Sequence, residues 1–453
     1  MRSVETLVVG AGLAGLSTAY HLERFGRRDV LLVEKAGKVG GRASTEEKDG
    51  FLFDQTGHLL HLHDPYGRRL VARLLAGNLV RRERSAWIFS NKVFTRYPFQ
   101  ANTYGLPPRV VEDCVALFVK TKYRPVPLST SASFEEWCLA TFGEGICRHF
   151  MFPYNAKLWR ARLSGLTTEW QGRFVPTPAA EEVLYGALRD QKKFFGYNSA
   201  FLYPARGGIQ ALADAFAQRV RNLRLNSPLE RVDLERRVAH VGGLGEVRYE
   251  NLVSTMALPF LLDRAVRLSG PVRKARAALR WRDVYNLNLG IGRAESSGRH
   301  WVYFPEERFA FYRAGFLTNF SKGMAPKGAA SIYTEISRRP GEKADLARLE
   351  RRILAGLRSC GLVRASDRVL AKQWNRMECA YVLYDRERTP AVKAIQEHLL
   401  RRGARSIGRW GAWKYSFMEE SILDGKRCAE ALAGRERRES AAQENGAELR
   451  PLR

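Results

Sequence analysis

The sequence predicts an α/β protein in which a Rossmann-like nucleotide-binding domain is joined to an inserted helical domain and an antiparallel-sheet substrate domain. Three observations predict this architecture. Residues 5–42 have the pattern of strand, glycine turn, helix and second strand; residues 102–195 have helical apolar periodicity; and residues 284–336 contain alternating segments typical of strands. The helical region would therefore be inserted between the first and second parts of the nucleotide-binding fold.

The first element carries the most specific motif. The apolar strand is followed by Gly10, Gly12 and Gly15, spaced as GxGxxG. Gly10 allows the tight turn, Gly12 lets the backbone approach a pyrophosphate, and Gly15 lets the helix pack close to the strand. Glu34 ends the second strand, at the distance expected of an acid that binds a ribose. Together these features predict a dinucleotide-binding site.

A second glycine pair narrows the cofactor. Gly40 and Gly41 are followed by Arg42, which adds a backbone approach and a cation beside the same phosphates. FAD enzymes of the glutathione-reductase type extend the motif in this way, so FAD is favoured over NAD. A buried strand over 252–255 is expected to complete the sheet, and its Ser254 is a further candidate for cofactor binding.

The remaining elements divide the chain into discontinuous domains. A hairpin is expected over 237–250, before the strand at 252–255, and a closing helix over 418–432. We expect a nucleotide-binding domain from residues 1–75, 205–265 and 405–433, a helical domain from 102–200, and a sheet domain from 76–101 and 280–404. Residues 434–453 are charged and poor in apolar side chains, which predicts a flexible tail.

Composition excludes several classes of protein. No stretch approaches eighteen uninterrupted apolar residues, so no transmembrane segment is expected. The first strand begins within six residues of Met1, which leaves no room for a cleavable signal peptide. The six cysteines are scattered, without a CxxC pair or a metal-ligand pattern, and are expected to be reduced thiols. We therefore expect a cytoplasmic protein with no metal site.

The formal net charge of +28 invites a polyanionic partner. The basic residues are spread along the whole chain, arginine is far commoner than lysine, and no nucleic-acid motif is present. The sequence therefore predicts no nucleic-acid partner. An anionic substrate, peripheral association with a membrane, and a merely compositional origin of the charge stay open, as does oligomerisation.

Polar and aromatic residues gather in clusters that resemble a known family. The first cluster is Gly57-His58, close to the first nucleotide-binding segment. The chain resembles the flavin-dependent UDP-galactopyranose mutases, whose motifs FMxPYNxKxW, PYPFQNN, PARGG, YFPE and FYRA have counterparts at residues 150–159, 97–102, 204–208, 303–306 and 311–314. Order and spacing agree over roughly Val4 to Leu432, so the similarity does not depend on one motif.

The resemblance implies an isomerase that interconverts the pyranose and furanose forms of a nucleotide-diphosphate sugar. In that family, N5 of reduced FAD attacks the anomeric carbon, so the reduced cofactor is the active form and NAD(P)H or another donor is the reductant. A role in cell-surface polysaccharide biosynthesis would follow. The sequence shows no Ser/His/Asp, Cys/His or metal constellation, which is consistent with chemistry delegated to the cofactor.

The resemblance also implies a set of site residues. Arg173 and Arg313 match the arginines that bind the diphosphate, and a planar guanidinium suits a bidentate phosphate contact. His58 matches the histidine beside the flavin, and Tyr381 and Tyr415 resemble two tyrosines that contact the diphosphate, with core packing as their alternative role. The substrate-side candidates are Tyr97, Gln100, Tyr154, Asn155, Trp159 and Tyr303, of which Trp159 could equally be a wall residue of the helical domain.

Two segments depart from the family pattern, and other functions stay open. The family's tyrosine followed by Pro-Thr-Pro is replaced by residues 381–385, and its Asn-Gln-Asp segment by residues 416–420. The alternative function is an FAD-dependent oxidoreductase of the amine oxidase, protoporphyrinogen oxidase or desaturase type, which would share the fold and have an apolar substrate cavity. A third hypothesis, a basic flavoprotein that binds a membrane or polyanion, rests on net charge alone.

Overall fold

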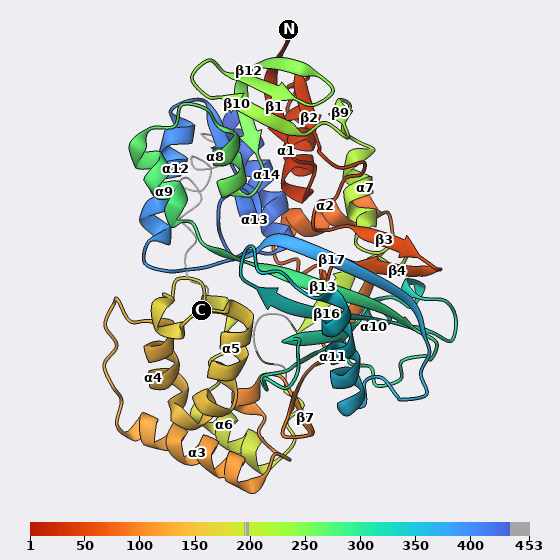
Figure 1. Ribbon diagram of the computed structural model, residues 1–453, viewed down its shortest axis with the longest axis vertical. Helices are drawn as coiled ribbons and strands as arrows, with labels where there is room; N and C mark the ends of the chain where they lie inside the picture. Colours follow the sequence, from red (N-terminus) through yellow and green to blue (C-terminus); the bar gives the residue numbers. More distant parts are fainter. Residues whose placement is uncertain (194, 196–198, 435–453) are drawn as a thin grey trace, which may run out of the picture.

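The computed structural model describes residues 1–193, 195 and 199–434. It confirms the predicted fold class: a nucleotide-binding sheet lies at one end, a second sheet crosses the middle, and a layer of helices lies at the other end (Figure 1). The predicted tail, apart from Gly434, falls outside the described residues.

The nucleotide-binding sheet is built around β1 (Arg2–Val9). Its strand order is β10 (Leu229–Asp233), β11 (Val238–Val241), β12 (Gly245–Ser254), β1, β2 (Val30–Val33) and β9 (Leu223–Arg224), with β18 (Ala404–Ser406) paired to the end of β12. β1 is parallel to both β2 and β12, with Thr6 opposite Val30 and Asn251. All four residues of β2 are buried, as expected for a parallel strand covered on both faces.

One prediction about this sheet is wrong. The expected hairpin over 237–250 and the expected separate strand at 252–255 form a continuous strand, β12. Its first half is antiparallel to β11, and its last residues are parallel to β18. No turn separates the halves because residues 246–254 all stay paired with β1 or its neighbours.

Helices cover this sheet and bring the chain end back to its start. α1 (Leu13–Arg24) packs along α14 (Met418–Leu432), which has the predicted bounds of the closing helix. A Cβ atom at Gly425 would lie 2.5 Å from the carbonyl oxygen of Ala14, so a glycine is required at this crossing. The other helices near this sheet are α2 (Pro65–Leu75), α7 (Gln210–Ala217), α8 (Leu258–Arg264), α9 (Gly270–Ala278), α12 (Arg388–Leu400) and the short α13 (Gly408–Gly411).

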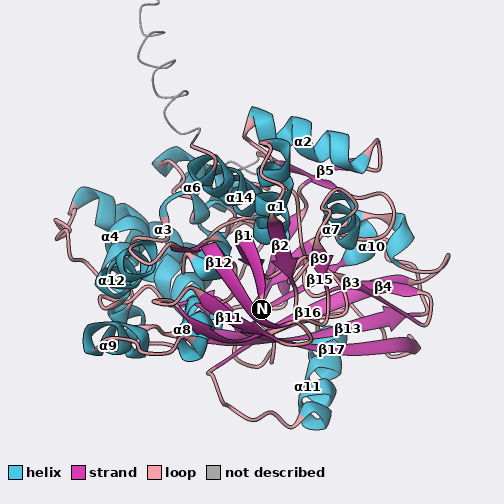
Figure 2. Ribbon diagram, turned by 90° about the horizontal axis from the view of Figure 1, so that it is seen from above, coloured by secondary structure: helices cyan, strands magenta, loops and turns pink. Residues whose placement is uncertain are grey.

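The second sheet contains the predicted alternating strands. Its order is β17 (Val369–Val382), β13 (Trp281–Ile291), β16 (Ala330–Arg338), β15 (Arg313–Phe316), β14 (Trp301–Tyr303), β6 (Ala86–Ser90) and β7 (Val93–Arg96). α11 (Leu346–Ser359) lies on one face of it and buries Leu349, Ile353 and Leu357, which are spaced one helical turn apart (Figures 1 and 2). Two short sheets, β3 (Thr45–Lys48) with β4 (Phe51–Asp54) and β5 (Val80–Glu83) with β8 (Ala200–Tyr203), complete the strands described here.

The helical layer comprises α3 (Pro108–Tyr123), α4 (Phe134–Ile146), α5 (Phe152–Trp159) and α6 (Ala180–Leu188). The apolar run over 134–150 is not one helix: Gly143 has a φ of 74°, and Cys147–Met151 form a π-helical turn. Glycine is needed at 143 because a Cβ atom there would lie 2.6 Å from the carbonyl oxygen of Leu117.

The division into three domains by residue range stays a proposal. α12 packs against α9 and β18, so this helix accompanies the nucleotide-binding sheet although the predicted sheet domain includes its residues. Among the described residues, no helix combines the length and the apolar character needed to cross a membrane.

Candidate functional site

A cavity of about 680 Å³ begins at the carboxyl ends of β1 and β2 and extends to the second sheet. Ligands of open α/β sheets bind at this edge, outside the carboxyl ends of the strands. One end of the cavity is lined by the glycine turn and by residues 33–36 and 255–257. The other end is lined by aromatic rings and arginines from residues 84–97, 301–313 and 377–416.

The glycine turn has the geometry that its spacing predicts. A Cβ atom at Gly15 would lie 1.9 Å from the carbonyl oxygen of Gly10, so the first turn of α1 can pack here only without a side chain. Gly10 and Gly41 have φ angles of 97° and 58°, in the left-handed region that favours glycine. Gly12 faces the cavity, and the nearest atom to a Cβ placed there is the carbonyl oxygen of Gly40, at 3.9 Å.

These features fit a dinucleotide. Gly12 caps α1 without a side-chain hydrogen bond, so the first N–H groups of the helix are open to a phosphate. Glu34 accepts from the backbone N–H of Ala11 at 2.7 Å through Oε2 and of Ala36 at 2.9 Å through Oε1. These bonds hold the carboxylate at the cavity wall, and each oxygen retains a lone pair for a ribose hydroxyl.

The structure places the predicted cofactor residue Ser254 away from the cavity. Ser254 is completely buried, and its hydroxyl accepts from the backbone N–H of Met256. The next residue, Thr255, lines the cavity instead. Its hydroxyl lies 3.0 Å from the carbonyl oxygen of Val9 and would be 2.4 Å from a Cβ at Gly10. Adjacent strand residues face opposite sides, so an error of one position exchanges a wall residue for a core residue.

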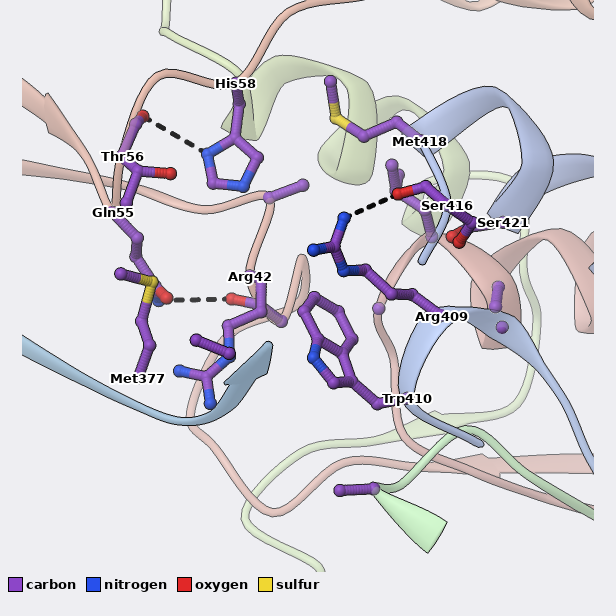
Figure 3. A pocket seen from close by; sticks show the side chains of 18 of the residues that line it. Arg42, Gln55, Thr56, His58, Met377, Arg409, Trp410, Ser416, Met418 and Ser421 are labelled. Atoms are coloured by element: carbon purple, nitrogen blue, oxygen red, sulfur yellow. Dashed lines mark hydrogen bonds between the residues drawn. The ribbon is translucent and has the colours of Figure 1, made fainter. Parts of the chain in front are cut away.

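Arg42 lies beside the second glycine pair, at the point where β17 passes the cavity. It donates through Nη2 to the carbonyl oxygen of Glu378 at 2.6 Å, and its guanidinium lies 5.9 Å from the ring centre of Trp410. Figure 3 shows Arg42 and Trp410 together on one side of the cavity, with His58 and Arg409 pointing into the same space. The predicted position of Arg42 at the cofactor wall stays a prediction for its phosphate contact.

His58 is a neutral group surrounded by cations. Its Nδ1 lies 3.3 Å from the carbonyl oxygen of Thr56 (Figure 3). Burial, together with the guanidinium groups of Arg409, Arg313 and Arg42, lowers the pKa of His58 to about 4. With the Nδ1 proton donated to Thr56, Nε2 is an acceptor at neutral pH.

Arg313 reaches the cavity from the first residue of β15. Its Nε and Nη2 contact the two carboxylate oxygens of Glu335 on β16, at 3.1 and 2.6 Å. Although burial opposes the charge, Glu335 and the neighbouring tyrosine hydroxyls hold the pKa of Arg313 well above its ordinary value. The guanidinium is therefore a permanent cation of fixed orientation.

Tyr381 and Tyr415 lie together with Arg409. The two rings stack with centres 6.1 Å apart and an interplanar angle of 16°. The guanidinium of Arg409 lies 4.5 Å from the ring centre of Tyr415 and 5.7 Å from that of Tyr381. Arg409 also donates to the carbonyl oxygen of Ser416 at 2.7 Å, which fixes its direction (Figure 3). All three residues line the cavity.

The substrate-side candidates fall into two groups. Tyr97 and Tyr303 line the cavity with ring centres 5.2 Å apart, and Arg84 lies 5.3 Å from the ring centre of Tyr97. Tyr154 packs behind them, edge to face with Tyr303 at 5.3 Å. The structure thus brings the predicted tyrosines together, two of them at the wall.

The second group has structural partners and does not line the cavity: Gln100, Asn155 and Trp159. Gln100 donates to the carbonyl oxygen of Pro176 at 2.6 Å. Asn155 donates to the carbonyl oxygen of Met151 at 2.8 Å and accepts from Trp159 Nε1 at 3.1 Å. Direct substrate contact from these three side chains is not favoured by this geometry, which instead gives Trp159 the wall role in the helical layer.

Arg173 lies in the short 3-10 helix Gly172–Phe174, but its side chain falls outside what the structure describes. Its neighbour Phe174 lines the cavity. The diphosphate contact expected of Arg173 therefore stays a prediction.

Sequence reasoning did not assign site roles to Arg84, Arg409 or Glu335. Arg409 stood in a Gly-Arg-Trp-Gly segment, where the flanking glycines could have indicated close packing at a site. Glu335 stood at an otherwise apolar position of a predicted strand, and a buried acid in such a strand is a signal for a partner cation. In the described part of the chain, no group of three His, Cys, Asp or Glu side chains could hold a metal ion.

A family model for flavin containing amine oxidoreductases matches residues 13–433. The chain belongs to the flavin-containing amine oxidoreductase family. Membership of this family implies a flavin cofactor, for which the glycine turn and Glu34 provide the site.

Curated members of this family match short segments only. A possible lysine-specific histone demethylase 1 of Drosophila melanogaster is 42% identical over 50 residues, which are 11% of this chain and 6% of that protein. Prenylcysteine oxidase 1 of Bos taurus is 32% identical over 111 residues, which are 21% of this chain and 22% of that protein. The chain thus matches no more than 22% of the length of these relatives.

Solved structures match over nearly the whole chain. Reduced UDP-galactopyranose mutase superimposes with a TM-score of 0.90 at 24% identity, covering 95% of this chain and 96% of that one. A putative protoporphyrinogen oxidase from Exiguobacterium sp. 255-15 gives 0.72 at 14% identity, covering 95% and 98%. Putrescine oxidase bound to putrescine gives 0.64 at 16% identity, covering 96% and 99%. At these identities the likeness shows a shared fold.

Proposed function

We propose that this chain is a nucleotide-sugar mutase of the UDP-galactopyranose mutase type, which interconverts the pyranose and furanose forms of a UDP-linked hexose with reduced FAD. The observation that carries the proposal is the positive charge at the aromatic end of the cavity. Arg84, Arg313 and Arg409 meet there from three separate segments of the chain. Planar guanidinium groups suit the bidentate recognition of a diphosphate.

The partners of these arginines support an anionic substrate. Arg84 donates to the carbonyl oxygen of Phe195 at 2.6 Å and Arg409 to that of Ser416 at 2.7 Å. A carbonyl oxygen orients a guanidinium without neutralising it. Of the charged residues that line the whole cavity, six are basic and three are acidic, and Glu335 is paired with Arg313: Lys35, Arg42, Arg84, Arg264, Arg313 and Arg409 against Glu34, Glu335 and Glu378.

This field is unfavourable for the substrates of the alternative function. An alkyl amine is a cation near neutral pH and would be repelled by the guanidinium groups. A carotenoid or porphyrinogen would have to desolvate them without supplying a counter-charge. A diphosphate supplies both charge and hydrogen-bond acceptors, and the fold shared with reduced UDP-galactopyranose mutase agrees with this choice.

The residues of the chain have distinct roles in this proposal. Bound reduced FAD would supply the nucleophile for the anomeric carbon. Arg313 and Arg409 hold the diphosphate while it is separated from the sugar, so that it stays in place to recombine. The tyrosine rings Tyr97, Tyr303, Tyr381 and Tyr415 wall the sugar and exclude water. Neutral His58 offers an acceptor near the cofactor without adding to the positive charge.

One experiment separates the mutase from the oxidoreductase. Purified flavoprotein is incubated with UDP-galactopyranose or UDP-galactofuranose, with and without dithionite, and the products are separated by chromatography. The proposal expects interconversion only with reduced flavin. Flavin reduction by an amine with formation of hydrogen peroxide, and no interconversion, would establish the oxidase instead.

Binding of UDP tests the arginine assignment. Arg173→Ala and Arg313→Ala are each expected to weaken UDP binding at least tenfold in calorimetry while the flavin stays bound. Arg293→Ala is a matched control, because Arg293 makes an equally close bidentate ion pair with Asp367 but does not line the cavity. Unchanged UDP affinity in both variants would show that these arginines do not bind the diphosphate.

A further inference from the structure

The segment between α3 and α4, residues 122–131, is exposed throughout and carries large apolar side chains. The exposed fractions of Tyr123, Val126 and Leu128 are 83%, 68% and 44%. We call this segment the α3–α4 loop. It runs along the outer side of the helical layer, away from both sheets (Figures 1 and 2). Its side chains therefore face solvent in the isolated chain.

The charge around these apolar residues has one sign. Between Asp113 and Glu135 the chain contains Lys120, Lys122 and Arg124 and no acidic residue. All three basic residues are exposed. Lys122 donates to the carbonyl oxygen of Thr141 at 3.1 Å, which leaves its charge in place.

The backbone of the α3–α4 loop is suited to an apolar environment. Pro125 and Pro127 have no N–H group, so the apolar part of the loop has fewer donors to desolvate. Beyond it, Ser131 donates through its N–H to the hydroxyl of Ser129, and Ala132 to the carbonyl oxygen of Ser129. The polar end of the loop thus satisfies part of its own hydrogen bonding.

We propose that the α3–α4 loop inserts into the interface of a lipid bilayer that carries anionic headgroups. Tyr123 suits the headgroup level, where its ring is buried and its hydroxyl is hydrated, and Val126 and Leu128 reach the acyl boundary. Lys120, Lys122 and Arg124 would contact the negative headgroups, each strengthening binding by about fivefold. A protruding loop without a groove favours a bilayer over a folded protein partner, and the aliphatic residues favour it over a nucleic acid.

Vesicle flotation with the full-length flavoprotein tests the proposal. Vesicles of phosphatidylcholine with about one third phosphatidylglycerol are expected to bind the protein at least tenfold more strongly than phosphatidylcholine alone. Tyr123→Ser/Val126→Ser/Leu128→Ser is expected to lose at least tenfold of that binding. Its control is Leu346→Ser/Leu370→Ser/Leu400→Ser, which removes apolar residues of 38%, 44% and 57% exposure elsewhere. Equal binding by the two triple variants would overturn the proposal.

The charge contribution has its own pair of variants. Lys120→Gln/Lys122→Gln/Arg124→Gln is expected to bind anionic vesicles at least tenfold more weakly, whereas Arg221→Gln/Arg236→Gln/Arg427→Gln removes as many exposed charges elsewhere and keeps binding. Equal losses in both variants would show that only the net charge acts, and would overturn a specific role of the loop.

A site-specific probe tests insertion directly. The six native cysteines are all buried, so Val126→Cys offers a selectively accessible thiol for an environment-sensitive nitrobenzoxadiazole dye. Anionic vesicles are expected to shift its emission to the blue and raise its intensity, while the same dye on Leu370→Cys keeps its spectrum. An unchanged spectrum at position 126 would contradict insertion.

Discussion

Arg313 and Glu335 form a two-point ion pair across adjacent strands, with Nη2 2.6 Å from Oε1 and Nε 3.1 Å from Oε2. The two residues are directly opposite in the pairing of β15 with β16. The hydroxyl of Tyr312 donates to the same carboxylate at 2.6 Å. The carboxylate therefore sets the plane of the guanidinium and uses only Nε and Nη2, so that Nη1 is left outside the pair for a ligand.

This pair predicts how the Arg313 variant behaves in unfolding experiments. Glu335 is 1% exposed, so Arg313→Ala leaves a buried carboxylate with only Tyr312 as a side-chain partner. The free energy of unfolding should fall by about 3 kcal/mol. Arg313→Ala/Glu335→Gln should recover at least half of that loss, because a neutral amide costs less to bury. Urea denaturation followed by fluorescence measures both values, and equal losses would show that the carboxylate is not the source of the cost.

Lys157 predicts a coupling between the helical layer and the same sheet. Its ammonium group on α5 donates to the carbonyl oxygens of Phe304, Glu306 and Phe311, at 2.8, 2.9 and 2.8 Å. These carbonyls belong to the turn between β14 and β15, which ends one residue before Tyr312. Lys157→Met keeps the side-chain length but leaves three carbonyls without this donor, and should cost about 3 kcal/mol of stability.

The same variant should also weaken UDP binding, because the turn that positions Arg313 is loosened. Lys372→Met is the matched control, since Lys372 is an exposed lysine paired with Glu350 at 2.7 Å, and it should cost less than about 1 kcal/mol. Urea denaturation and calorimetry with UDP test the two effects. Equal stability of the two lysine variants would show that the three hydrogen bonds are not important for the fold.

The first glycine motif shows how much a local pattern can predict. GxGxxG, the acid at Glu34 and the pair before Arg42 act within one strand, turn and helix, and the structure places them at one end of the cavity as their spacing requires. The closing helix α14 was predictable for the same reason, because its amphipathic pattern is local.

The aromatic end of the cavity was only partly predictable. Tyr97, Tyr303, Tyr381 and Tyr415 meet there from segments far apart in the chain, and their motifs indicated a site without indicating their contacts. Asn155 looked like a polar ligand residue, but its amide is used inside the helix by Met151 and Trp159. Whether a polar side chain faces a cavity or a neighbouring backbone depends on helix phase and packing, which a single sequence does not specify.

The glycine turn predicts a loss of cofactor that differs by position. Gly15→Ala would place a methyl group 1.9 Å from the carbonyl oxygen of Gly10, so the turn must open and the phosphate site is lost. The purified variant should contain less than a tenth of the wild-type flavin, measured by visible absorbance relative to protein. Gly165→Ala is the control, because a Cβ there meets nothing within 4 Å. A Gly15→Ala protein with full flavin content would contradict the assignment of this turn to the cofactor.

Buried histidines predict that the protein loses stability in mild acid. Burial lowers the pKa of His21, His58, His61 and His300 to about 4 in each case. In the unfolded chain these groups titrate near 6.5, so between pH 6.5 and 4 the unfolded state binds more protons than the folded state. The sign is therefore a loss of stability as pH falls through this window, and the effect is absent above it. At pH 5.5 each histidine should cost about 1 kcal/mol.

His300 is the clearest place to test this acid sensitivity, because it does not line the cavity. Its Nδ1 accepts from the backbone N–H of Ser85 at 2.9 Å, a bond that an amide oxygen can replace. His300→Gln should therefore narrow the difference in unfolding free energy between pH 7.5 and 5.5 by about 1 kcal/mol. His240→Gln, at a half-exposed side chain on β11, should leave that difference unchanged. If both variants keep the wild-type difference, the acid sensitivity must come from carboxylates, because the folded state would then bind as many protons at position 300 as the unfolded chain.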